Sequence, residues 1–421
     1  MTTTLQELKD YYKSVFFIED DFIIDLVLAI ALGIHTNSDP VWLMIVGGSS
    51  SGKSEIIQML DFVKYVHPVS NMTENTFLSG SPSSNGKETS LLKEMGPKGI
   101  ITMKDYTSIL AMRSEKKEVI TSQMREIFDG HIVKKTGNGL NPEWKGKMNF
   151  IGGVTDAIYS ADGESAAMGR RAVIYSMPQQ DRKKTLNRSR QNTNDGEEKR
   201  NKIKQLAHDY MEEMIPVMPL TLPPIDEELS QELMELANFS THARSPTERD
   251  YKGMLNLVHD AEMPMRVSQQ LHLLAQILIH MNDGKLTDTC KYGLYKIAFD
   301  NIPKLRRKSL NILAQYRRVT AKGLAQTTNY PTETAKRWLE DLNVLGILTR
   351  GLDQRSKMDM FQLQKEYRSL ILKYNKIEYI DDDLIGNEET ADYSYGGDAY
   401  SMDIEIAKAE QLKSKQEFLE F

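Results

Sequence analysis

The pattern of hydrophobic and polar positions divides the first half of the chain into strand-like and helix-like runs. Unbroken hydrophobic runs bounded by polar turns predict buried strands at residues 41–46, 100–103, 148–154 and 172–176. Helical patterns lie between them. Residues 1–35 are expected to form N-terminal helices, whose most hydrophobic run is too short to span a bilayer. Strands that alternate with helices predict an α/β fold with a mainly parallel sheet and helices on both faces.

The second half of the chain has a mainly helical pattern. After the break MPLTLPP, helices are expected at residues 227–238, 246–259, 264–281 and 287–300. A helix, a short helix, a helix opened by Pro331 and two strands then follow, which is the order of a winged helix-turn-helix. The expected domains are N-terminal helices (1–35), an α/β core (36–225), a helical lid (226–300), a winged helix (301–373) and a tail with a terminal helix (374–421).

Charge is distributed unevenly over this second half. The whole chain carries a formal net charge of −6. Residues 301–372 hold 14 Lys or Arg against 6 Asp or Glu, whereas residues 374–421 hold 4 against 13. The winged-helix segment is therefore basic, and the tail is acidic and expected to be disordered up to its last helix, residues 402–421.

Cysteine usage and the N-terminal residues indicate the compartment. The single cysteine, Cys290, excludes an intramolecular disulfide and a cysteine-cluster metal site, which is typical of a reducing cytosol. The first residues are polar and acidic, unlike a targeting peptide. Both features predict a cytoplasmic protein with no membrane partner.

A glycine- and serine-rich loop, GGSSSGKS, follows the first strand and satisfies the pattern GxxxxGK[ST]. Backbone N–H groups of this loop are expected to curl around a phosphate, and they come from Gly47, Gly48, Ser49, Ser50, Ser51 and Gly52. Lys53 would reach the β- and γ-phosphates of ATP, and Ser54 would hold Mg²⁺ at the positive end of the next helix. The alternative is a flexible turn between two core elements.

Polar residues follow the next two strands where a nucleotide site needs them. Asp105 is the candidate acid for Mg²⁺ or for the attacking water, or it caps the next helix. Lys104 and Tyr106 flank it, so the usual pair of acids is missing. Thr155 is a candidate polar sensor of the γ-phosphate or the water, or a strand-end threonine that satisfies its own turn.

Two arginines are candidates for contact with the phosphates. Arg171, beside Arg170, precedes the fourth strand, where an arginine can stabilise transition-state charge in a neighbouring subunit's site. Arg266, near the start of an expected helix, could fold onto the same nucleotide. A surface salt bridge and a solvated side chain are the respective alternatives.

Two basic segments are candidates for DNA contact. Lys134 and Lys135, in the hairpin-like segment HIVKKTGNG, could line a central channel and track phosphates, or belong to a solvated turn. In the winged-helix segment the candidates lie on the recognition-type helix and on the wing: Thr334, Lys336, Arg337, Arg350, Arg355 and Lys357. That module or the tail could instead dock a replication protein.

The order of these motifs resembles that of the AAA+ ATPases, and within them the minichromosome-maintenance-like replicative helicases of phages and mobile elements. The corresponding segments are MKDY, REIFDG, HIVKKTGNG, NFIGGVTDA, GRRAVIYSMP, EMPMRVSQQL and TAKGLAQTTNYPTETAKRWLEDL. The resemblance implies a P-loop ATPase core at 36–225. It also implies the roles of the candidates: Lys53 and Ser54 on nucleotide and Mg²⁺, Asp105 as the acid, Thr155 and Arg266 as sensors, and Arg171 as the arginine finger.

The expected function is that of an ATP-dependent DNA motor, a replicative DNA helicase that assembles as a homo-oligomeric ring, a hexamer. ATP and Mg²⁺ are the expected cofactors, and DNA is the expected partner. A helicase loader or partner-remodelling ATPase is one alternative. An ATP-gated DNA-binding switch or regulator with little hydrolysis is another, because Lys104 stands where the family's metal-binding aspartate belongs.

Overall fold

The structure is a computed structural model that describes residues 3–79, 90–135, 141–160, 171–258, 261–353 and 357–386. The chain divides into two units. The first comprises Met1–Met234 and Met265–Asn301, and the second comprises Glu235–Pro264 and Ile302–Phe421. Residues 226–300, expected as a separate helical lid, are therefore divided between the two units.

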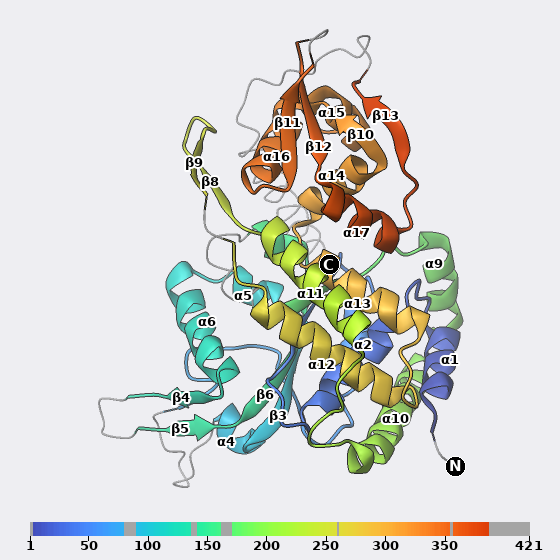
Figure 1. The fold of residues 1–421 in the computed structure, drawn as a ribbon. Helices are drawn as coiled ribbons and strands as arrows, with labels where there is room; N and C mark the ends of the chain where they lie inside the picture. Colours follow the sequence, from blue (N-terminus) through green and yellow to red (C-terminus); the bar gives the residue numbers. More distant parts are fainter. Residues whose placement is uncertain are drawn as a thin grey trace, which may run out of the picture. The chain divides into compact units, whose positions relative to one another are not determined.

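A five-stranded parallel sheet lies at the centre of the first unit (Figure 1), in agreement with the predicted α/β pattern. Its strands stand in the order β2-β3-β6-β1-β7 and span Val66–Pro68, Lys98–Met103, Lys147–Val154, Trp42–Val46 and Ala172–Ser176. Every residue of β1 is buried, as expected for a strand with neighbours on both sides. The arrangement is compatible with a P-loop-like α/β fold.

Helices surround this sheet. They are α1 (Leu5–Val15), α2 (Phe22–Gly33), α3 (Lys53–Gln58), α4 (Leu91–Met95), α5 (Thr107–Leu110), α6 (Ser114–Phe128), α7 (Ala157–Ser160), α9 (Arg182–Gln191), α10 (Gly196–Met214), α11 (Glu227–Ala243, which continues into the second unit), α12 (Met265–Met281) and α13 (Asp288–Asp300). Helix α2 is hydrophobic on all sides and buried along its whole length, because it packs against both α12 and β6.

Neighbouring residues of a strand face opposite sides of the sheet, and each side is covered by helices. Trp42 of β1 and Phe150 of β6 share one hydrophobic core with residues of α5 and α6. Asn149, the neighbour of Phe150, faces α2, where its Nδ2 donates to Ile30 O (2.6 Å). Its Oδ1 accepts from Val41 N (3.0 Å), just before β1. Because side chains alternate along a strand, Asn149 and Phe150 lie on opposite faces of the sheet. Both meet helices, so helices cover both faces.

The second unit contains a four-stranded sheet in the order β11-β12-β10-β13. Its main elements are α14 (Lys304–Gln315), β10 (Tyr316–Val319), α15 (Ala321–Thr328), α16 (Thr332–Val344), β11 (Leu348–Leu352), β12 (Asp359–Leu363), α17 (Lys365–Asn375) and β13 (Ile380–Leu384). The helix opened by Pro331 corresponds to α16, which begins at the next residue because proline suits the position before a first helical turn.

Strand β13 corrects the expectation that the acidic tail is disordered from residue 374. It pairs in parallel with β10. Asp383 accepts hydrogen bonds from Nε of Arg317 (3.0 Å) and Nε of Arg318 (3.1 Å). Hydrogen bonds from Arg318 and Arg317 lower the pKa of Asp383 to about 2. Residues 387–421, with the expected terminal helix, lie outside the described residues.

A hairpin replaces the helix expected at residues 246–259. It consists of β8 (Thr247–Arg249) and β9 (Leu255–Val258), paired antiparallel. Between them, Gly253 adopts a φ of +76°. Asp250 Oδ1 accepts from the N–H groups of Lys252 (2.9 Å) and Met254 (2.8 Å). A side chain that bonds to nearby backbone N–H groups favours a turn over a helix, and so does a glycine with positive φ.

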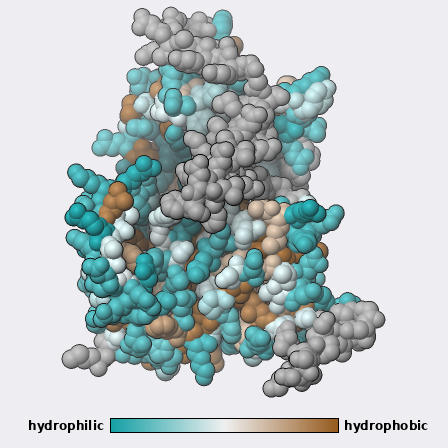
Figure 2. All heavy atoms as spheres, turned by 180° about the vertical axis from the view of Figure 1, so that it is seen from behind, coloured by the Kyte–Doolittle hydropathy of each residue, from teal (hydrophilic) through white to brown (hydrophobic). Residues whose placement is uncertain are grey.

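Hydrophobic and hydrophilic residues are mixed on the surface. On the face drawn in Figure 2, hydrophobic residues lie scattered among hydrophilic ones, which is normal for a folded domain. Within the described part of the chain, no helix combines the length and the hydrophobicity needed to cross a membrane.

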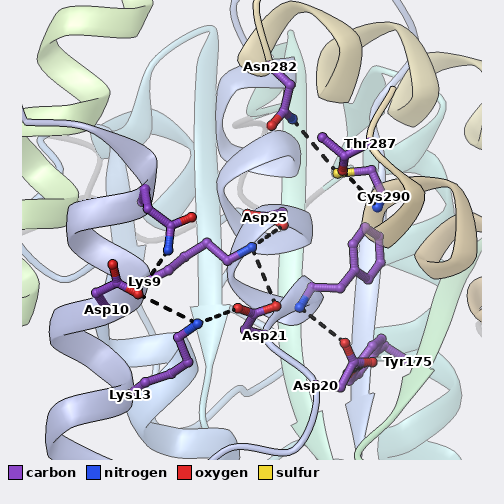
Figure 3. A network of polar contacts seen from close by, with 12 residues as sticks. Lys9, Asp10, Lys13, Asp20, Asp21, Asp25, Tyr175, Asn282, Thr287 and Cys290 are labelled. Atoms are coloured by element: carbon purple, nitrogen blue, oxygen red, sulfur yellow. Dashed lines mark hydrogen bonds and ion pairs between the residues drawn. The ribbon is translucent and has the colours of Figure 1, made fainter. Parts of the chain in front are cut away.

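A buried polar network fastens α1 to α2 (Figure 3). Lys9 donates to Asp25 Oδ2 (2.8 Å) and lies 3.5 Å from Asp21 Oδ1; the side chains of Lys9 and Asp25 are 11% and 2% exposed. Tyr175 of β7 donates to Asp20 Oδ2 (2.7 Å), so the network also reaches the sheet. Burial raises the pKa of Asp25 to about 6, against the attraction of Lys9.

Replacing Lys9 by Met should reduce the free energy of unfolding by about 3–5 kcal/mol, because Asp25 stays buried without its counter-ion. The double variant Lys9→Met/Asp25→Leu should recover most of that loss, since a hydrophobic pair needs no desolvation of charge. Urea unfolding of Lys9→Met, Asp25→Leu and the double variant measures this. Lys13→Met serves as control, because the Lys13 side chain is 40% exposed. Additive effects of the two substitutions would contradict direct coupling.

Stability should also depend on pH through Asp25. Between about pH 4 and pH 6 the folded chain keeps the Asp25 proton that the unfolded chain has lost, because the folded pKa is raised. The free energy of unfolding should therefore fall by about 3 kcal/mol as pH rises through this window, and Asp25→Asn should remove that fall. Urea unfolding of wild type and Asp25→Asn at several pH values tests this. Parallel pH profiles would exclude the effect.

Candidate functional site

The loop that follows β1 needs glycine at one position and leaves little room at another. Gly52 has a φ of +91°, which a side chain would strain. A Cβ atom on Gly47 would lie 2.7 Å from Ser51 Oγ. The loop therefore curls tightly from the end of β1 to Lys53, the first residue of α3. In such a curl, successive backbone N–H groups can surround an anion.

Lys53 lies against the inside of this loop. Its Nζ donates to Gly47 O (2.6 Å) and to Gly48 O (2.7 Å). Burial lowers the pKa of Lys53, and the negative charges of Asp105 and Asp156 oppose that change. Two carboxylates thus lie close enough to Lys53 to act on its charge.

The pairing of the strands brings these groups to one edge of the sheet. β1 pairs in parallel with β6, with Val46 opposite Val154, and β6 pairs in parallel with β3. The carboxyl ends of the three strands therefore lie side by side. The loop follows β1, Asp105 follows β3 and Thr155 follows β6. This edge is where ligands bind in open parallel α/β sheets.

Thr107 connects two of the candidate residues. Its N–H donates to Asp105 Oδ1 (3.0 Å), and its Oγ1 accepts from Thr155 N (3.1 Å). Asp105 thus bonds to the first residue of α5, as in the alternative considered from the sequence. Its other oxygen, Oδ2, accepts no hydrogen bond from the described residues. One carboxylate oxygen is fixed by the fold, and the other can face a ligand.

Asp156 is a site residue that the sequence interpretation did not select. It is exposed, it follows Thr155 directly, and its charge acts on Lys53 together with that of Asp105. A second carboxylate at this edge therefore comes from the neighbouring strand and not from position 104, where Lys104 is exposed. The available signal was an acid directly after the third hydrophobic run, next to a polar sensor candidate.

Arg171 and Arg266 lie together at the opposite edge of the sheet. Arg171 precedes β7, whose first residue pairs with Trp42, the first residue of β1. The guanidinium carbons of both arginines lie 5.8 Å from the centre of the Phe128 ring. Arg171 Nη2 also lies 3.4 Å from Asp129 Oδ2. Burial lowers the pKa of Arg171; Asp129 opposes this, and the charge of Arg266 adds to it.

The length of β1 separates this arginine pair from the loop. β1 has five residues. At about 3.3 Å per residue, roughly 16 Å therefore separate the loop at one end of β1 from the arginine pair at the other end. That distance exceeds the reach of an arginine side chain. Arg266, expected on the same nucleotide as Lys53, therefore lies with Arg171 instead.

The two lysines of the basic hairpin differ in their surroundings. The hairpin is formed by β4 (His131–Val133) and β5 (Glu143–Lys145). Lys134 Nζ donates to three oxygens of residues 74–78, at 2.5–3.1 Å, and so fastens the hairpin to that segment. Lys135 is exposed. Residues 136–140, between the two strands, lie outside the described residues.

On α16, the DNA-contact candidates are also unequal. Lys336 is exposed. Thr334 is only 9% exposed and packs into the interior of the second unit. Arg337 is half-buried, and its guanidinium group packs against Gly253. A Cβ atom on Gly253 would lie only 2.6 Å from Arg337 Nη2. Of the three candidates on α16, Lys336 and Arg337 are thus the two that can meet a ligand.

On the wing-like strands, Arg350 pairs with Asp359, with Nη2 and Oδ2 2.7 Å apart. This pair crosses from β11 to β12, so the charge of Arg350 is already matched within the sheet. Lys357 is exposed and has a φ of +57°. Arg355 lies outside the described residues.

Two comparisons with known proteins found no match for this sequence. No protein-family model matches the sequence, and no curated protein matches it. The interpretation of the site therefore rests on the loop, on the strand-end carboxylates beside it, and on the arginine pair at the opposite edge of the sheet.

Proposed function

We propose that this chain is an ATP-dependent AAA+ motor that acts on DNA, a cytoplasmic DNA helicase for the replication of a phage, plasmid or mobile element. The observation that carries the proposal is the convergence of Lys53, Asp105 and Asp156 beside the curled loop. A phosphate in this loop would meet backbone N–H groups and an ammonium group, with carboxylates next to it. That combination suits binding and hydrolysis of ATP.

Each of these groups has a role in the proposed hydrolysis. Lys53 offsets negative charge on the β- and γ-phosphate oxygens, and Thr155 contacts the γ-phosphate. Ser54 and Asp105 would hold Mg²⁺, which would supply positive charge to the phosphates. Asp156 orients the attacking water. Mg²⁺ would bind together with ATP, because phosphate oxygens complete its coordination in P-loop sites.

A ring of copies would complete this site. Arg171 and Arg266 are too far from the loop of their own chain to reach a phosphate bound there, by the roughly 16 Å span of β1. In a head-to-tail ring, the same two arginines would face the nucleotide of the next copy. There they would stabilise the charge of the transition state. We therefore propose a homo-oligomeric ring, a hexamer, with ATP bound between subunits.

The proposed DNA contact involves both units. The order α14-β10-α15-α16-β11-β12 supports a winged helix-turn-helix with α16 as its recognition helix. Lys336, Arg337 and Lys357 would meet DNA phosphates, and Lys135 would face DNA in the central channel. The excess of 14 basic over 6 acidic residues in 301–372 favours DNA over a protein ligand.

Lys104 favours a second candidate, an ATP-gated DNA-binding switch or regulator. Its exposed ammonium group lies next to Asp105 in sequence, so a positive charge occupies a position where a carboxylate would help to hold Mg²⁺. Such a site would bind ATP and hydrolyse it slowly. Hydrolysis measurements distinguish the two candidates.

Lys53→Ala should weaken ATP binding about 10- to 100-fold, because a charged hydrogen-bond donor to the phosphates is removed. Isothermal titration of Mg²⁺-ATP into the full chain measures this. Lys64→Ala, an exposed lysine shortly after α3, is the matched control and should bind ATP like wild type. Equal ATP affinity of Lys53→Ala and wild type would overturn the proposed site.

ATP turnover should rise with single-stranded DNA and should fall at least about 100-fold in Asp105→Asn and in Arg171→Ala. Mixing these two inactive variants should restore part of the activity. In a mixed ring, some interfaces combine an intact Asp105 from one subunit with an intact Arg171 from its neighbour. Arg190→Ala, an exposed arginine, is the control.

The outcome of the turnover assay separates the candidate functions. Absence of restoration in every mixture would exclude a shared site. Turnover that responds to a protein partner but not to DNA would indicate a loader or remodelling ATPase. Tight ATP binding with negligible turnover would indicate the switch.

A further inference from the structure

The turn of the β8–β9 hairpin carries two large side chains into solvent. Tyr251 is 87% exposed and Met254 is 66% exposed. The turn itself is closed by hydrogen bonds, from Met254 N to Asp250 Oδ1 (2.8 Å), from Asp250 N to Met254 O (2.8 Å) and from Gly253 N to Asp250 O (2.9 Å). The exposed ring of Tyr251 is therefore presented by an ordered turn.

A single arginine fixes this hairpin to α16, beside which it stands in Figure 1. Arg249 Nη2 donates to Asp341 Oδ1 (2.6 Å) and to Arg337 O (3.0 Å). Its Nη1 donates to Gly253 O (2.8 Å) and lies 3.3 Å from Glu340 Oε2. The Arg249 side chain is only 10% exposed. Hairpin and helix thus form one rigid surface.

Charges of both signs lie at this surface, and the cations include exposed lysines. Glu340 and Asp341 both lie against Arg249, and Asp341 Oδ2 also lies 3.9 Å from Nη2 of Arg306, so two carboxylates face two guanidinium groups. Lys252 is exposed, with its Nζ 5.4 Å from the centre of the Tyr251 ring. From α16, Arg337 lies against Gly253, and Lys336, the residue before it in the helix, is exposed.

Two acids lie among these three cations. Asp250 and Glu248 carry the negative charges of the hairpin, and Asp250 is engaged by the N–H groups of the turn. An exposed aromatic ring among cations is the combination that binds single-stranded nucleic acid, because the ring stacks on a base and the cations meet the phosphates.

We propose that the β8–β9 hairpin and α16 together form a binding site for single-stranded DNA. Tyr251 stacks on an unpaired base, and Lys252, Lys336 and Arg337 contact the flanking phosphates. This site rests on the proposed function, because it shares α16 with the proposed DNA contact. It adds a specific ligand, the unpaired strand, since bases in a duplex are stacked on each other and leave no free face for the ring.

The test is the binding of labelled oligothymidylate to the full chain, followed by fluorescence anisotropy. Tyr251→Ala should weaken binding about 5- to 100-fold. Tyr251→Phe keeps the ring and should bind like wild type. Met254→Ala, in the same turn but without a ring, is the matched control and should also bind like wild type. Affinity for duplex DNA should be unchanged in Tyr251→Ala.

Two failures can be told apart. If wild type binds no DNA, the proposed function fails together with this inference. If wild type binds DNA and Lys336→Ala weakens binding while Tyr251→Ala does not, only the inference fails. Loss of ring assembly on sedimentation in both Tyr251→Ala and Met254→Ala, with DNA affinity unchanged, would mean that the hairpin contacts another copy of the chain, which also overturns the inference.

Discussion

The parallel pairing of β1 with β6 and β7 is the constraint on which the candidate site depends. Because the strands run in one direction, their carboxyl ends collect the curled loop, Asp105, Thr155 and Asp156 at one edge. The same pairing holds Arg171 at the other edge. A slip of one residue would exchange the two faces of β1 and take Trp42 and Met44 out of the core that they share with Phe150, so the register is strongly specified.

The N-terminal helices support this sheet at an electrostatic cost. Helix α2 is buried on all sides and still contains Asp25, whose charge must be matched by Lys9 from α1. Such a buried pair adds little to stability compared with a hydrophobic pair, but removal of one partner is costly. The pair therefore ties the position of α1 to that of α2, and Tyr175 extends the tie to the edge strand β7 through Asp20.

Basic residues in the second unit are largely used within the fold. Arg317 and Arg318 share Asp383 of β13, Arg350 pairs with Asp359, and Arg249 fixes the hairpin. A count of basic residues therefore overstates the positive charge that is free to meet DNA. The cations still presented at the surface are fewer, and one of them, Lys252 of the hairpin, lies 5.4 Å from the centre of the exposed Tyr251 ring.

The sequence by itself determined the features that depend on neighbouring residues: the parallel α/β pattern, the curled loop at Lys53, the acid at Asp105 and the elements around α16. Tertiary structure alone decided which of these meet. Asp156 lies near Lys53 because β6 lies next to β1. Arg266 lies near Arg171 because α12 packs in the first unit. Strand β13 depends on a partner 65 residues away, because Asp383 pairs with Arg318, and the attachment of the β8–β9 hairpin to α16 depends on one 92 residues away, because Arg249 donates to Asp341. Local periodicity carries no information about such distant partners, since strand order and ion pairing are set only when the chain is packed.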